Sequence, residues 1–118
     1  MLPVKVPDTG NFLGILGNSS SNQVVDTILA AGRSYLPDFP VIGLKLYLGA
    51  ERIIPNMTRS DHVSFWENEI PATMWTDTAD FRNPNYHRRT DTPDTLDYDF
   101  LASVTKVLIA SVLATGPH

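Results

Sequence analysis

The chain has 118 residues, of which 42% are hydrophobic and 19% charged, a composition typical of one soluble globular domain. A formal net charge of −4 argues against binding to nucleic acid, and the absence of cysteine excludes disulfides, thiolate metal ligands and a cysteine nucleophile. The start of the chain lacks the pattern of a signal peptide, and no apolar run approaches the length of a membrane span. We therefore expect a soluble protein that binds neither nucleic acid nor a membrane; its composition does not reveal its compartment.

The first predicted elements are a buried strand and an amphipathic helix. Residues 11–18 form a short apolar run closed by a Gly-Asn pair, which is consistent with a strand. Ser20 and Gln23 then have the spacing of a capping box and predict the start of a helix. Pro37 ends this helix, whose apolar face is expected to contain Val24, Val25, Ile28, Leu29, Gly32 and Tyr35.

Two more strands and two more helices follow. Residues 41–49 alternate and predict a strand whose better buried face carries Ile42, Leu44, Leu46 and Leu48. A short helix is expected within residues 60–69, with Asp61 or the serine before it as its cap, and residues 71–77 show a weaker strand pattern. A long helix is predicted over about residues 97–115, with one apolar face formed by Leu101, Val104, Leu108 and Val112.

The predicted order is strand, helix, strand, short helix, strand, helix. This alternation indicates an α/β fold with mostly parallel strands and helices that cover the sheet. No repeat, low-complexity tract or linker divides the sequence, so residues 1–118 are expected to form a single domain.

His87 is the first candidate for chemistry, because it lies in a polar loop directly before the last predicted helix. Nearby carboxylates could bind a metal beside the imidazole or orient it, and they belong to Asp77, Asp80, Asp91 and Asp94. The alternative is that these aspartates form turns and caps, which the stretch "DTPDT" favours. One histidine cannot form a metal site by itself, so further ligands would be needed.

Asp61 and His62 form the second candidate site. Asp61 is most simply explained as a helix cap, and sequence spacing does not show whether His62 and His87 meet. The sequence lacks H-E-x-x-H, G-x-S-x-G and P-loop patterns, which argues against a helical zinc site, a serine hydrolase and a phosphate-binding loop. The aromatic residues between the two candidates are expected in the core rather than in a ligand platform, namely Phe65, Trp66 and Trp75.

Residues 59–108 closely resemble the C-terminal half of the family-28 metallopeptidases, the di-zinc aminopeptidases, whose relatives include glutamate carboxypeptidase and glutaminyl cyclase types. The shared features are an S-D-H-x-x-F turn, an E-I-P-A strand, a Y-H loop, a D-T-x-D-T-L stretch and the following helix. "PDTGNFLGILGN" also resembles the segment that comes earlier in those enzymes. The resemblance implies an α/β/α sandwich around a mixed sheet, with the active site at the carboxyl ends of the strands.

The resemblance also assigns roles to individual residues. His87 matches the family's last zinc ligand, and Tyr86 matches a position that in some members helps to stabilise the tetrahedral intermediate. Asp61 matches an aspartate of the active-site hydrogen-bond network in the cyclase branch. The residues implied to line the site wall and contact a peptide substrate are Trp75, Asp77, Asp80, Phe81 and Arg82.

Most of the family's zinc site has no counterpart in this sequence. The family binds two zinc ions through a His, a bridging Asp, a Glu and another Asp upstream of the final His, and a glutamate beside the Glu ligand is the general base. In family order these residues precede the segment that resembles "PDTGNF", where this chain begins. We therefore expect a C-terminal portion of a zinc aminopeptidase that binds zinc weakly or not at all alone and is inactive alone. Many relatives are exported.

Two alternatives remain open. The chain could be a non-catalytic interaction module, in which exposed strand edges and apolar surface favour self-association or binding to a complementary N-terminal half. A homodimer could also rebuild a metal site from His87, His62 and nearby aspartates across its two-fold axis.

Overall fold

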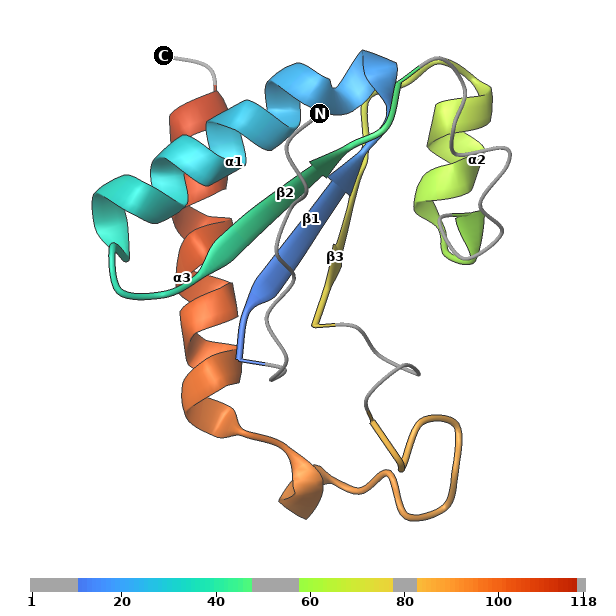
Figure 1. Cartoon of the computed structure of the whole chain (residues 1–118), viewed down its shortest axis with the longest axis vertical. Coiled ribbons are helices and arrows are strands. Elements are labelled where there is room, and N and C mark those ends of the chain that lie inside the picture. Colours follow the sequence, from blue (N-terminus) through green and yellow to red (C-terminus); the bar gives the residue numbers. More distant parts are fainter. Residues whose placement is uncertain (1–10, 48–57, 78–82, 117–118) are drawn as a thin grey trace.

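The computed structural model describes residues 11–47, 58–77 and 83–116, and Figure 1 shows how their elements are arranged. Short 3-10 turns precede two of the helices, at Ser19–Ser21 and Pro93–Thr95. The strands and helices of the described residues are β1 (Leu13–Gly17), α1 (Asn22–Tyr35), β2 (Val41–Lys45), α2 (His62–Glu67), β3 (Thr73–Thr76) and α3 (Tyr98–Thr115). The elements expected from the sequence are therefore present in the expected order.

The described strands form a mixed sheet in the order β2-β1-β3. β1 pairs in parallel with β2 and antiparallel with β3, so that Ile15 lies opposite Gly43 on one side and Trp75 on the other. The α/β class is confirmed, whereas the expectation of mostly parallel strands holds for one of these two pairings. The antiparallel pairing also places the carboxyl end of β3 beside the amino end of β1, where Gly14 pairs with Thr76.

Helices α1 and α3 pack on the same face of the sheet and against each other. The buried core cluster joins strand and helices through Leu13, Ile15, Val25, Ile28 and Val107. Ile15, Val25 and Val107 are fully buried, and burying three such side chains contributes roughly 1.5–3 kcal/mol each. The described residues thus supply the sheet and one helical layer.

Close packing of α1 on the sheet requires glycine at two strand positions. A Cβ on Gly17 would come within 2.5 Å of Val25 Cγ2, and one on Gly43 within 2.8 Å of Leu29 Cδ1. Gly43 therefore points toward α1, and by strand alternation Ile42 and Leu44 point to the opposite face of the sheet. Both are half-buried, so the sheet carries apolar side chains on its second face as well.

Helix α3 is rotated away from the orientation that apolar spacing predicted. Its buried residues are Val107, Ala110 and Ser111. Of the expected face, Val104 packs against the core, but the other members are about half exposed, namely Leu101, Leu108 and Val112. A helix that is apolar almost all round cannot be oriented by apolar spacing alone, and here the smaller side chains are buried. Tyr35 of α1 is likewise 72% exposed instead of lying on the buried face.

The start of α1 is held by a hydrogen-bond network and not by the expected capping box. Ser21 is the N-cap and makes no side-chain capping bond. Asn18 Oδ1 instead accepts hydrogen bonds from the hydroxyls of Ser20, at 3.0 Å, and Ser21, at 2.7 Å. Ser21 Oγ in turn accepts a hydrogen bond from the backbone N–H of Ala72 at 3.0 Å. This network connects the end of β1 to the segment that enters β3.

By length and composition alone, α3 meets the criteria for a helix that crosses a membrane, with 18 residues and a mean hydropathy of 1.4. It is the one such helix in the described part of the chain. Core helices of soluble proteins meet the same criteria, so this property is weak evidence for a membrane span.

Candidate active-site loop

The segment that contains Tyr86 and His87 begins with a tight turn. Pro84 and Asn85 are its central residues, and the Tyr86 N–H donates a hydrogen bond to the Asn83 carbonyl at 3.2 Å. The Asn83 side chain adds a second bond, since its Oδ1 accepts from the Asn85 N–H at 2.9 Å. Proline and asparagine favour such turns because proline fixes φ and asparagine bonds to the nearby backbone. The turn therefore fixes the backbone just before His87.

His87 has a left-handed backbone conformation, with a φ of 55°. This conformation is uncommon outside glycine, although histidine is among the residues that tolerate it. The imidazole is exposed and stacks on the half-buried Tyr86 ring, with centroids 4.0 Å apart and ring planes at 13°. The predicted metal ligand and the predicted phenol donor are thus adjacent in space as well as in sequence.

Two of the aspartates that follow His87 make hydrogen bonds typical of turns and caps. Asp94 accepts a hydrogen bond from the hydroxyl of Thr92, and Asp97 caps α3 by accepting from the Phe100 N–H at 3.0 Å. Tyr98 closes the same segment by donating from its hydroxyl to the Pro93 carbonyl at 2.8 Å. The alternative that the aspartates near His87 form turns and caps is therefore confirmed at Asp94.

Asp61 and His62 have different surroundings. Asp61 occupies the N-cap position of α2 as expected, but its exposed side chain makes no capping hydrogen bond. His62 is buried and contacts Trp66 edge to face, with centroids 4.4 Å apart. Trp66 fixes this helix by donating from Nε1 to the Ala72 carbonyl at 2.8 Å. His62 is therefore part of the packing of α2, while the Asp61 carboxylate faces solvent.

The predicted substrate-contacting residues lie along and beyond β3. Trp75 is half-buried, packs against the core cluster on the α1 side and donates from Nε1 to Thr73 Oγ1 at 3.0 Å. Asp77 is exposed just after the strand. The remaining three, Asp80, Phe81 and Arg82, lie outside the described residues.

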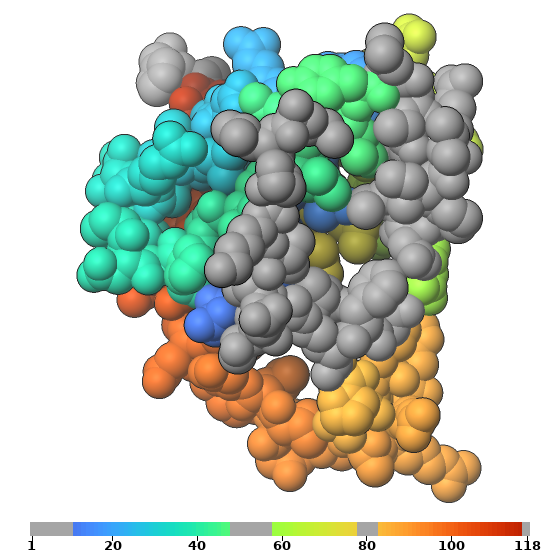
Figure 2. All heavy atoms as spheres, viewed as in Figure 1, coloured from blue at the N-terminus to red at the C-terminus, as the bar shows by residue number. Residues whose placement is uncertain are grey.

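The two motif segments lie in different parts of the molecule. Residues 83–97 follow the carboxyl end of β3 and project at one end of the molecule, whereas α2 lies beside the other end of the sheet (Figure 1). Figure 2 shows the projecting segment in orange. Within the described ranges, no group of three or more His, Cys, Asp or Glu side chains is placed to hold a metal ion. The part of the chain that is described does not form a complete zinc site.

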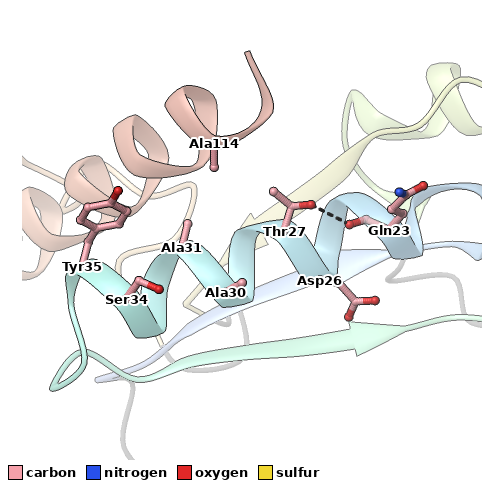
Figure 3. A pocket seen from close by; sticks show the side chains of 8 residues that line it. All are labelled: Gln23, Asp26, Thr27, Ala30, Ala31, Ser34, Tyr35 and Ala114. Carbon is pink, nitrogen blue, oxygen red and sulfur yellow. Dashed lines mark hydrogen bonds between the residues drawn. The ribbon is translucent and has the colours of Figure 1, made fainter. Parts of the chain in front are cut away.

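An open groove of about 430 Å³ lies elsewhere, along α1 and the end of α3 (Figure 3). Small and hydroxylated side chains line it, together with Gln23, Asp26 and Tyr35. None of the predicted site residues takes part in it. The groove is therefore separate from the candidate active site.

Comparison with known proteins assigns the chain to a family. The sequence model described as Peptidase family M28 matches residues 47–112, which include α2, β3, the Tyr86–His87 loop and most of α3. The Escherichia coli (strain K12) uncharacterized protein YfbL is 36% identical over 103 residues, covering 87% of this chain and 30% of the relative. The chain thus spans about a third of the length of this curated relative. No solved structure matches the chain. The chain belongs to peptidase family M28.

Proposed function

We propose that this chain is the C-terminal portion of a zinc-dependent aminopeptidase-like hydrolase, in which His87 is a metal ligand and Tyr86 a hydrogen-bond donor. Membership of peptidase family M28 supports the peptidase class of reaction. The reaction we propose for the whole protein is hydrolytic removal of an N-terminal residue from a peptide. Its α/β/α sandwich would place a second helical layer over the sheet face that carries Ile42 and Leu44.

The observation that carries this proposal is the stacked pair of Tyr86 and His87 on an exposed turn. An exposed imidazole whose backbone is fixed can hold a metal without losing packing in the core. The phenol beside it is a suitable donor to an oxygen atom that gains negative charge during acyl transfer. Zinc, when bound, would supply Lewis-acid chemistry at such a site.

The described residues supply only part of what a zinc site needs. Catalytic zinc is held by three protein ligands, and no cluster of that size occurs within the described ranges. This chain covers 30% of the relative YfbL. The other ligands and the base would come from a portion of the domain equivalent to the part of YfbL that the chain does not match. We propose that the isolated chain has little or no peptidase activity for this reason.

A second candidate function is a non-catalytic interaction module. It is favoured by the large apolar side chains that α3 leaves exposed, since such surfaces mark contact sites. The two candidates differ in whether the chain, once combined with the rest of a peptidase domain, contributes a group that the reaction needs.

The test compares the wild-type chain with His87→Ala and, as a matched exposed control in the same turn, Arg88→Ala. Zinc is measured by equilibrium dialysis and elemental analysis, first on each chain alone at micromolar concentration. Each chain is then co-expressed with a truncated YfbL from which the segment that matches this chain has been removed. Bound zinc and hydrolysis are measured again on the complex. The substrates are a leucine anilide and its N-acetylated form, because an aminopeptidase requires the free amine.

We expect negligible zinc on the isolated chains, and zinc with amine-dependent hydrolysis in the wild-type and Arg88→Ala complexes. His87→Ala should lose most of the activity and part of the zinc. Full activity in the His87→Ala complex, or a folded complex without hydrolysis, would contradict the proposal. One zinc per isolated chain, lost in His87→Ala, would show that the chain or its homodimer forms a site of its own.

A further inference from the structure

The side of α3 that faces away from its buried residues is apolar over most of the helix. Five large side chains on this side are between 48% and 72% exposed: Leu101, Leu108, Ile109, Val112 and Leu113. At 3.6 residues per turn, they fall on one arc opposite the buried Val107 and Ala110. We refer to these five residues as the outer face of α3.

The outer face carries no charge. The charged residues of α3 are Asp99 and Lys106, which are seven positions apart and therefore lie on the same flank of the helix. From Leu101 to Leu113 the face is roughly 18 Å long at 1.5 Å per residue. It could therefore accept about three turns of a second helix with an apolar side.

A helix that is apolar on both sides is normally buried on both sides. In α3 the side with Val107 is buried against the rest of the described structure, and the side with Ile109 is left in solvent. The residues of α3 up to Val112 lie within the segment that the family model matches. Four of the five residues of the outer face, all except Leu113, therefore belong to the segment that this family shares.

We infer that the outer face of α3 is the docking surface for the complementary portion of an M28 peptidase domain. The occupant is a protein segment with an apolar face, equivalent to part of the region of YfbL that this chain does not match. The coverage of 30% of that relative means that most of its length is available to supply such a segment. This inference rests on the proposed function, because it names the surface through which the divided site is completed.

The absence of cysteine makes this surface directly testable by thiol labelling, since a single introduced cysteine is the only thiol in the chain. Ile109→Cys reports on the outer face. Tyr47→Cys is the matched control, because Tyr47 is 57% exposed, against 55% for Ile109, and follows β2. The rate of alkylation by iodoacetamide is measured at each site by mass spectrometry, for the chain alone at several concentrations and for the chain co-purified with truncated YfbL.

In the complex we expect alkylation of Ile109→Cys to slow by at least about tenfold, while Tyr47→Cys changes by less than about twofold, because thiol reactivity follows exposure. The double variant Ile109→Gln with Leu113→Gln should weaken the complex by about 100-fold, because it removes apolar contact area. Both positions are exposed and glutamine favours helices, so circular dichroism should remain unchanged.

Failure to co-purify, equal labelling in the free and bound chain, or normal binding of the double variant would overturn the inference. Protection of Ile109→Cys that depends only on the chain's own concentration would overturn it too, and would identify a second copy as the occupant. Hydrolysis separates the two proposals. If Ile109→Cys is protected in the complex but no hydrolysis occurs, the docking surface is supported and the proposed function is contradicted. If the double variant still forms a tight complex that hydrolyses the substrate, the proposed function is supported and the docking surface is contradicted.

Discussion

The rings of Tyr86 and His87 lie face to face, with centroids 4.0 Å apart and planes at 13°. Neighbouring side chains usually point apart, and the left-handed backbone of His87 accompanies this unusual placement. The stack limits the orientations of the imidazole. It also keeps the phenol of Tyr86 close to any ion that the imidazole binds. The relationship therefore gives the loop a defined geometry on an otherwise exposed surface.

Tyr86→Phe separates the two roles of this tyrosine, because phenylalanine keeps the stacking ring and removes the hydroxyl. In the reconstituted complex we expect kcat to fall by roughly 10²–10³-fold, which is the usual cost of removing one donor to a developing oxyanion. Zinc content should stay unchanged. Steady-state kinetics and elemental analysis test this, and an unchanged kcat would show that the hydroxyl has no such role.

Val107→Ala should destabilise the chain by about 2–3 kcal/mol, because Val107 is fully buried and the substitution leaves a cavity. Val112→Ala is the matched control on the same helix. Val112 is 58% exposed, so its replacement should change the free energy of unfolding by less than about 0.5 kcal/mol. Urea unfolding at one protein concentration measures both. A larger loss for Val112→Ala than for Val107→Ala would mean that α3 is oriented as its apolar spacing suggested.

Ser21→Ala should cost roughly 1–3 kcal/mol, because it leaves the Ala72 N–H without the acceptor that Ser21 Oγ provides. Hydrogen exchange at the Ala72 amide should also be faster in this variant than in the wild-type chain. Ser20→Ala is the control, since the exposed Ser20 hydroxyl bonds only to Asn18 Oδ1 in this network. Slow exchange at Ala72 in the Ser21 variant would show that the network does not hold this segment.

Lys45 gives a prediction for pH. Its hydrogen bond to the Asp26 carboxylate raises the pKa of Lys45 above its ordinary value of 10.5, and the opposite charge of Asp26 adds to this effect. Because the folded value is the higher one, the pair stabilises the fold fully below pH 10.5 and loses that contribution as the pH rises through the folded pKa.

Lys45→Met should therefore lower the thermal midpoint only slightly at neutral pH, since Asp26 is exposed and Lys45 half-buried, so that water screens the pair. The difference from the wild-type chain should disappear above the folded pKa. Lys106→Met serves as the control for loss of a positive charge. A deficit of Lys45→Met that persists unchanged at high pH would assign it to packing of the lysine stem instead.

Local patterns determined the order of the elements. Residues 13–17 are an apolar run that is fully buried in β1, and Asp97 caps α3 as expected for an aspartate before a long apolar run. The motifs around Asp61, Tyr86 and His87 also predicted the family that the comparisons show. These features are encoded by neighbouring residues, which is why one sequence was enough to find them.

Pairings between distant segments required the tertiary structure. The antiparallel pairing of β3 with β1 depends on segments about 60 residues apart, and it places the carboxyl end of β3 beside the amino end of β1. The side of α3 that is buried depends on contacts with α1 and the sheet, because leucine and valine occur all round the helix. The sequence by itself therefore determined the elements and the family, whose signals are local. Only the tertiary structure decided strand direction and helix orientation, because these depend on which surfaces meet. The stacking of Tyr86 on His87 is a local feature that the sequence pattern did not reveal.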